Sequence, residues 1–151
     1  MAHEQLKLDN QLCFPLYAVS RLITRNYQPF LDELGITYPQ YLVLLVLWEH
    51  DGLTVNEISK RLILNTNTTT PLLKRLEGLG IITRKRSGED ERKVLIELTG
   101  KGRKMESVAA AIPQKMSVGL LPEGISESDL VDLRERLSLI LNHLTDMEQG
   151  A

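Results

Sequence analysis

The stretch LILNTNTTTPLLKRLEGLG, from Leu62 to Gly80, carries the pattern that decides the fold. Its polar opening offers Asn65 or Asn67 as the cap of a helix, and Gly80 fits the C-terminal end of that helix. Between them runs a leucine stripe at helical spacing, formed by Leu72, Leu73, Leu76 and Leu79. Pro71 is compatible with a helix that starts at Asn67, because first-turn amides have no intrahelical acceptor.

A short helix is expected before this stretch and two strands after it. TVNE at 54–57 is a capping-box pattern, which predicts a helix with Ile58 and Leu62 facing inward. The runs IITRKR at 81–86 and RKVLIEL at 92–98 have the composition of strands, and the polar tip SGEDE between them predicts a hairpin. Three residues of the second run are expected to face inward: Val94, Ile96 and Leu98.

Two helices are predicted on the N-terminal side. Residues 9–30 place apolar side chains at helical spacing, and Pro29 and then Gly35 are expected to end or bend that helix. In the next helix Pro39 suits the first helical position, and the apolar pattern continues to Glu49.

Two more helices are predicted on the C-terminal side. Thr99 is expected to cap a helix that reaches about Ala111, and Ser126 to open a long last helix. That last helix has an apolar stripe formed by Leu130, Leu133, Leu137, Ile140, Leu141, Leu144 and Met147. We interpret the stripe as a self-association face shared with the N-terminal helix.

Length and composition are those of a single globular unit: 151 residues, 42% hydrophobic and 25% charged. The polar N-terminus is unlike a signal peptide, and the longest apolar run, at 41–48, is too short to cross a bilayer. These features predict a cytoplasmic protein without membrane contact. Three dispersed histidines show no metal-ligand spacing, so we expect neither metal nor cofactor.

Charge is unevenly distributed along the chain. Residues 60–104 hold 12 of the 18 Lys and Arg residues but only 5 of the 20 acids, which gives them a net charge of +7. The remainder carries −9. A basic middle within an acidic chain suits a polyanion such as DNA, although a solvated basic face would have the same composition.

The order of helix, short helix, capped helix and basic hairpin predicts a winged helix-turn-helix, a mainly α fold with a small β-hairpin wing. Small polar side chains in the first turn of the capped helix suit base edges in the major groove: Asn65, Thr66, Asn67, Thr68, Thr69 and Thr70. Lys74 and Arg75 follow on the same helix and are expected to reach phosphates.

The hairpin is expected to form a DNA-binding wing. Basic side chains border it: Arg84, Lys85, Arg86 and Arg92. An arginine at such a tip suits a narrow minor groove, where the negative potential is enhanced. Asp90 lies two residues before Arg92 and is expected to brace the turn and orient that arginine.

TPLLKRLEGLG followed by a hairpin that ends in D-E-R resembles the MarR family of dimeric winged-helix regulators. LDNQLCFPLYAVSR at 8–21 and ITYPQYLVLLVLWEHDGLTV at 36–55 are similar to its organic-hydroperoxide-sensing branch, the OhrR type. The resemblance extends over one unit, residues 8–148. It implies a dimerisation helix with a sensor cysteine in 1–36, a DNA-binding winged helix in 37–100, and helices completing the dimer interface in 101–151.

The resemblance also implies roles for single residues. The peroxide-sensing cysteine falls on Cys13, and the tyrosines that bond to it across the dimer fall on Tyr27 and Tyr38, with Tyr17 nearby. The family's wing arginine falls on Arg92, its bracing acid on Asp90 and its recognition-helix arginine on Arg75. Relatives often have Asp-Ser-Gly where this chain has Asn65-Thr66-Asn67, so the operator sequence does not carry over.

Cys13 can also be interpreted from its neighbours. Pro15 fits only near the start of a helix, which places Cys13 at a helix N-terminus, where free amides and the dipole favour a thiolate. The alternative is an inert buried thiol, which is common among lone cysteines. No second cysteine is present, so oxidised Cys13 would be capped by a low-molecular-weight thiol or a backbone nitrogen, or be over-oxidised.

We therefore expect a homodimeric repressor of a palindromic DNA operator that an organic hydroperoxide releases by oxidising Cys13. Two alternatives within the same class are a regulator that binds a small ligand, with Cys13 incidental, and a broader thiol-based stress or virulence regulator. A cysteine-dependent enzyme is not expected, because no histidine has an evident orienting partner. A module that only binds proteins would lack salt-dependent DNA binding.

Overall fold

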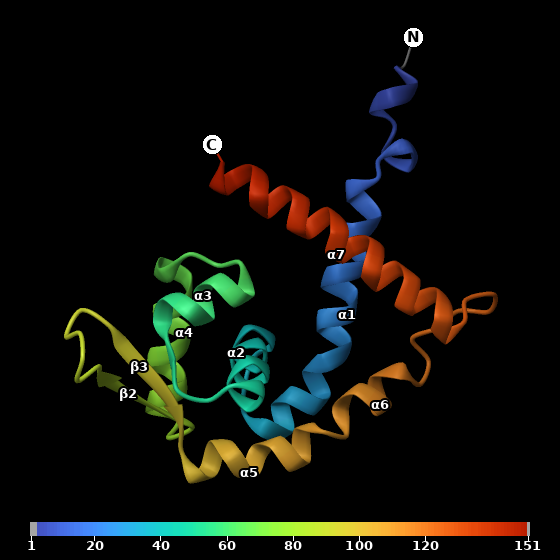
Figure 1. Ribbon diagram of the computed structural model, residues 1–151. Coiled ribbons are helices and arrows are strands. Elements are labelled where there is room, and N and C mark those ends of the chain that lie inside the picture. Colours follow the sequence, from blue (N-terminus) through green and yellow to red (C-terminus); the bar gives the residue numbers. More distant parts are fainter. Residues whose placement is uncertain (1–2, 151) are drawn as a thin grey trace. The chain divides into compact units, whose positions relative to one another are not determined.

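The computed structural model describes residues 3–150. The chain forms two compact units, of which the first ends at Ile112 and the second begins at Pro113 (Figure 1). The first unit contains five of the helices named below and all three strands, and both candidate sites lie in it.

The N-terminal part begins with two 3₁₀ turns, η1 (Glu4–Leu6) and η2 (Leu8–Asn10), and continues into helix α1 (Cys13–Leu34). The helix starts four residues later than predicted and passes through Pro29, which therefore neither ends nor replaces a turn of it. Gly35 ends it in the left-handed conformation, at φ 71°, with its amide donating to the carbonyl of Asp32.

Helix α2 (Tyr38–Glu49) is the centre of the core. Thr37 and Gln40 form a capping box at its start, and Pro39 occupies the first turn, as predicted. The helix is buried on most of its circumference, and its fully buried residues are Val43, Leu44 and Leu47. Burial on several faces explains why α2 is almost continuously apolar.

Helices α3 (Val55–Leu62) and α4 (Thr66–Gly78) form the helix-turn-helix. The predicted capping box at the start of α3 is present, and the Asn65 side chain caps α4 by accepting a 3.0 Å hydrogen bond from the amide of Thr68. Ile63 in the connecting turn has a left-handed backbone, at φ 56°, which is unusual for a β-branched residue.

Two expectations for α4 need correction. The helix starts at Thr66, so Pro71 lies in the second turn rather than the first. A proline at this position has no amide hydrogen to donate to the carbonyl of Asn67. Leu73 and Leu76 are fully buried as predicted, but Leu79 is 42% exposed because it follows the end of the helix.

The wing is a three-stranded antiparallel sheet in the order β1–β3–β2, composed of β1 (Leu53–Thr54), β2 (Ile82–Arg86) and β3 (Val94–Leu98). The hairpin of β2 and β3 was predicted, and its register pairs Arg84 with Ile96. β1 was not predicted, since a two-residue strand has no periodicity and depends on its partner β3.

Three helices complete the chain: α5 (Gly100–Ala109), α6 (Ile112–Ser117) and α7 (Glu127–Gln149). Thr99 caps α5, and Ser126 opens α7 with a capping box, both as predicted; α6 was not predicted. Within the described residues no single helix is long and apolar enough to cross a membrane, and α1 and α2 meet that test only as a pair bent by 72°.

Candidate functional site

The N-terminal half of α4 presents an exposed polar surface. Thr66, Asn67 and Thr68 are exposed, and Thr70 is partly exposed. Thr69 differs from its predicted place: it is fully buried, and its hydroxyl donates a 3.2 Å hydrogen bond to the carbonyl of Asn65. Thr69 lies four residues before buried Leu73, on the same side of the helix, which is the signal that sequence inspection could have used.

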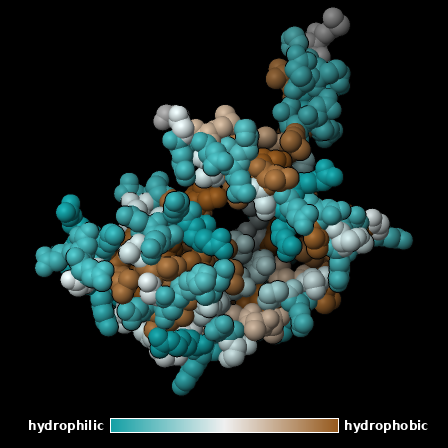
Figure 2. Space-filling view, in the orientation of Figure 1, coloured by the Kyte–Doolittle hydropathy of each residue, from teal (hydrophilic) through white to brown (hydrophobic). Residues whose placement is uncertain are grey.

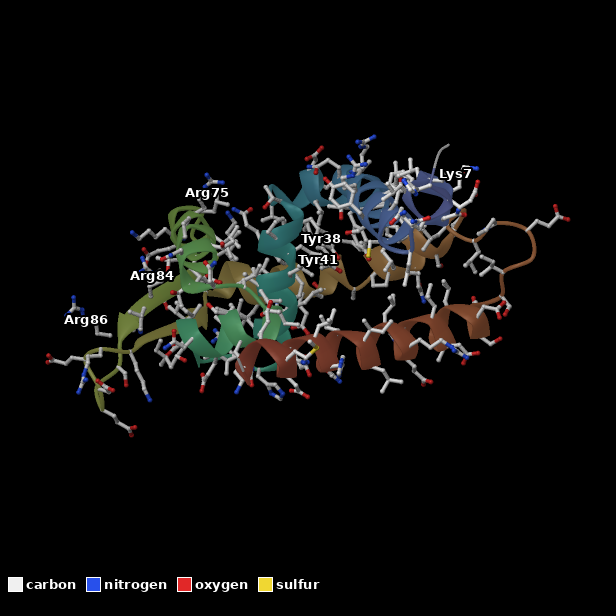
Figure 3. The ribbon with its side chains drawn as sticks, turned by 90° about the horizontal axis from the view of Figure 1, so that it is seen from above. Lys7, Tyr38, Tyr41, Arg75, Arg84 and Arg86 are labelled. Carbon is white, nitrogen blue, oxygen red and sulfur yellow. The ribbon has the colours of Figure 1, made fainter. Side chains whose placement is uncertain are left out.

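The C-terminal half of α4 adds positive charge to this surface. Lys74 and Arg75 are both exposed. Figure 3 shows Arg75 on α4 at the same end of the first unit as Arg84 and Arg86 of β2. The helix and the wing therefore place their basic side chains close enough to contact one stretch of polyanion.

The basic residues of β2 fall into two groups. Lys85 and Arg86 are exposed, whereas the Arg84 side chain is only 21% exposed and lies against α4, with Nη1 3.8 Å from Oε1 of Glu77. Its Nε is buried and has no hydrogen-bond partner among the described residues. The position of Arg84 thus suits packing of the wing against α4 better than contact with a phosphate.

The turn between β2 and β3 holds the predicted pair of Asp90 and Arg92. Asp90 Oδ1 accepts a 3.0 Å hydrogen bond from the backbone amide of Arg92 and lies 3.7 Å from Nε of the same residue. The Arg92 side chain is 95% exposed, so almost its whole length is available to a partner. Figure 2 shows hydrophilic side chains gathered over this tip.

Cys13 is the first residue of α1, and its side chain is exposed. The predicted position at a helix start is therefore correct, and the alternative of a buried, inert thiol does not fit this chain. One turn further along, Tyr17 is exposed and the guanidinium carbon of Arg21 lies 4.5 Å from the centre of its ring. Cys13, Tyr17 and Arg21 follow one another at four-residue steps, along one side of the helix.

Tyr27 and Tyr38 contact each other, with ring centroids 5.1 Å apart. Tyr41, which the sequence analysis left out, completes the cluster at 5.7 Å from Tyr27 and 6.2 Å from Tyr38. Burial raises the pKa of all three phenols, and the neighbouring tyrosines raise the pKa of Tyr38 and Tyr41 further. The three hydroxyls therefore remain protonated at neutral pH.

Cys13 and Tyr27 stand far apart within one chain. Both belong to α1 and are separated by 14 positions, which is about 21 Å along a helix axis at about 1.5 Å per residue. A thiol and a phenol at that separation cannot bond to each other. Any direct contact between Cys13 and the tyrosine cluster therefore requires two chains.

Apolar side chains are exposed along both long helices. On α1 these are Phe14, Leu16, Val19 and Leu22, and on α7 they include Leu133, Leu137, Ile140, Leu141 and Leu144. Such stripes on a helix normally face another protein surface. Among the described residues, no group of three or more His, Cys, Asp or Glu side chains could hold a metal ion.

A helix-turn-helix followed by a basic β-hairpin defines a winged-helix protein of the DNA-binding class. The family model described as transcriptional regulator SarA/Rot matches residues 25–107. The chain belongs to this family of transcriptional regulators, and its fold is of the MarR type that the sequence resemblance predicted.

A curated relative extends the similarity over nearly the whole chain. The organic hydroperoxide resistance transcriptional regulator of Bacillus subtilis is 51% identical over 141 residues, covering 93% of this chain and 94% of the relative. This similarity confirms the predicted resemblance to the peroxide-sensing branch.

Solved structures of AbfR are similar in both sequence and fold. The crystal structure of AbfR of Staphylococcus epidermidis is 43% identical with a TM-score of 0.73, over 95% of this chain and 97% of that one. Reduced AbfR bound to DNA is 43% identical with a TM-score of 0.76, over 96% and 99%. AbfR has also been solved in an overoxidized form bound to DNA and in a disulfide form.

Proposed function

We propose that the protein is a homodimeric repressor that binds a palindromic DNA operator and leaves it when an organic hydroperoxide oxidises Cys13. The single observation that carries this proposal is an exposed, lone cysteine at the start of α1 in a chain 51% identical to an organic hydroperoxide resistance regulator. A regulator of this kind acts on the chromosome, and a cytoplasmic location is part of the proposal.

DNA contact is assigned to the exposed half of α4 and to the wing. Thr66, Asn67, Thr68 and Thr70 would contact bases in the major groove, and Lys74, Arg75, Lys85 and Arg86 would contact phosphates. Arg92, braced by Asp90, would enter the minor groove. The buried Thr69 and the Glu77-facing Arg84 are left out of this set, and Asn65 serves as the helix cap.

The sensor is assigned to two chains. Cys13 of one subunit would lie beside Tyr27 and Tyr38 of the other, because these groups are too far apart to meet within one chain. Protonated phenols are suitable hydrogen-bond donors to a thiolate. Residues 1–36 and 101–151 would supply the dimer interface through the exposed faces of α1 and α7, and residues 37–100 the DNA-binding part.

The chemistry requires only Cys13 and the peroxide. The Cys13 thiolate attacks the distal oxygen of ROOH, the O–O bond breaks, and the alkoxide leaves and takes up a proton to form ROH. The sulfenic acid then condenses with a small thiol, losing water and forming a mixed disulfide, since the chain has no second cysteine. Overoxidized AbfR was solved bound to DNA, which favours the bulky mixed disulfide as the releasing form.

The test replaces Cys13 by Ser and measures operator binding with and without cumene hydroperoxide plus free L-cysteine. Cys13→Ser should bind the operator like the wild type and remain bound after peroxide treatment, whereas the wild type is released. Release of the Ser variant would disprove the sensor role. As a binding protein, the wild type should also consume no more than about one peroxide equivalent per subunit before the thiol is added, because catalysis would require turnover.

A further inference from the structure

Trp48 connects the tyrosine cluster to helix α5. Its ring stands edge-on to that of Tyr41, with centroids 6.3 Å apart. On its other side, the indole Nε1–H donates a 3.0 Å hydrogen bond to the carbonyl oxygen of Gly102. This bond joins residues 54 positions apart in sequence. Figure 3 shows the neighbouring Tyr38 and Tyr41 on α2, the helix that also carries Trp48.

Gly102 is in turn packed directly against the start of the wing. A Cβ atom at this position would overlap the carbonyl oxygen of Ile81 and lie 3.1 Å from Cδ2 of Leu98, so only glycine allows this approach. The same Ile81 carbonyl accepts hydrogen bonds of 3.0 Å from the amide and from the hydroxyl of Thr99. A shift of Gly102 therefore cannot leave the wing strands unaffected.

Together these contacts form an unbroken series from the tyrosines to the wing. Tyr27 and Tyr38 touch Tyr41, Tyr41 touches Trp48, and the Trp48 bond ends at a glycine wedged against β2 and β3. All of its members lie in the first unit. Close-packed interiors transmit displacement because they have few voids to absorb it.

A second connection holds the same end of α5 without involving aromatic residues. Asp51 Oδ2 accepts a 3.2 Å hydrogen bond from Nη2 of Arg103, and Asp51 Oδ1 accepts one of 2.9 Å from the backbone amide of Leu98. This connection leads from the loop after α2 to α5 and β3. Because it bypasses the tyrosines, it provides a matched control for the Trp48 bond.

We propose that Trp48 is a positioning residue that couples the tyrosine cluster to the wing through its hydrogen bond to Gly102. This inference rests on the proposed function and adds to it the route by which a change at the tyrosines reaches the DNA-binding surface. When a modified Cys13 displaces the partner subunit's tyrosine rings, Tyr41 and Trp48 follow, and Gly102 moves the wing. Loss of the indole N–H removes the last step but leaves the chemistry at Cys13 intact.

The test compares Trp48→Phe with Arg103→Gln in the full-length dimer. The release ratio is defined as the operator Kd after cumene hydroperoxide plus L-cysteine, divided by the Kd of the reduced protein. Trp48→Phe should bind the operator within about threefold of wild type when reduced, form the same amount of Cys13 mixed disulfide by mass spectrometry, and show a release ratio at least tenfold smaller. Arg103→Gln should keep the wild-type ratio. An unchanged ratio in Trp48→Phe, or an equal loss in both variants, overturns the proposal.

A second readout needs no substitution at Trp48, which is the only tryptophan in the chain. Formation of the mixed disulfide should change the tryptophan emission of the wild type but not that of Cys13→Ser, which controls for direct oxidation of the indole. Unchanged emission in a fully modified wild type contradicts the coupling. Failure of the wild type to release the operator at all would instead contradict the proposed function.

Discussion

The carboxylate of Asp90 holds Arg92 at two points: Oδ1 accepts a 3.0 Å hydrogen bond from the arginine's backbone amide and lies 3.7 Å from its Nε. The arginine is almost fully exposed, so the pair itself contributes little to stability. Its consequence is geometric, since it sets the direction in which Arg92 leaves the hairpin.

The wing pair yields a prediction about DNA affinity. Arg92→Ala should weaken operator binding by about tenfold or more, and the loss of one contact per subunit should reduce the salt slope by about one for each. Asp90→Asn should weaken binding less, and the double variant no more than Arg92→Ala alone, because Asp90 acts through Arg92. A further loss on adding Asp90→Asn to Arg92→Ala would show that the carboxylate has a role of its own.

The recognition helix yields a prediction that separates stability from specificity. Thr69→Val removes a buried hydroxyl and should lower the free energy of unfolding by about 1 kcal/mol, with base preference unchanged. Asn67→Ala, on the exposed face, should do the reverse and alter discrimination at one base pair by about 1–3 kcal/mol. Denaturant titration and binding to single-base operator variants measure the two effects. A changed base preference in Thr69→Val would refute the assignment.

Two glycines at the start of α5 form a matched pair. Gly102→Ala should lower the free energy of unfolding by roughly 1–3 kcal/mol, because the new methyl group collides with the Ile81 carbonyl. Gly100 has nothing within 4 Å of its Cβ position, so Gly100→Ala should be neutral or stabilising by up to about 1 kcal/mol. Equal stabilities of the two variants would rule out the close approach at Gly102.

The tyrosine cluster yields a prediction about alkaline pH. Burial raises the pKa of Tyr41 in the folded state, whereas an unfolded tyrosine ionises near its ordinary pKa of about 10. The unfolded chain therefore binds fewer protons above that pH, and the free energy of unfolding should fall as pH rises. The fall should be shallower in Tyr41→Phe than in the wild type, whereas Tyr17→Phe, at an exposed site outside the cluster, serves as the control. Identical slopes for wild type and Tyr41→Phe would contradict the prediction.

Local sequence patterns were sufficient to predict most helix starts. Asn65, Thr99 and Ser126 all cap the helices expected of them, because a cap satisfies backbone amides only two or three residues away. The same holds for the hairpin of β2 and β3, whose strands are joined by a short turn. Cys13 was correctly placed at a helix start for a similar reason, since Pro15 is acceptable only within the first turn.

Features that depend on distant partners were missed. β1 exists because Leu53 pairs with Ile96, and the contact of Trp48 with Gly102 spans 54 positions. Tyr41 escaped notice because its membership of the tyrosine cluster depends on how α1 packs against α2. Thr69 was misplaced because composition alone does not tell the buried face of a short polar turn from its exposed face.

The most direct test follows DNA release and the state of Cys13 in the same samples. Cumene hydroperoxide is added stepwise with L-cysteine present, operator binding is read by fluorescence anisotropy, and the Cys13 peptide is quantified by mass spectrometry. The account predicts that the bound fraction falls in proportion to the mixed disulfide on Cys13 and recovers when dithiothreitol reduces it. An operator that stays bound when every Cys13 carries the mixed disulfide would contradict the account.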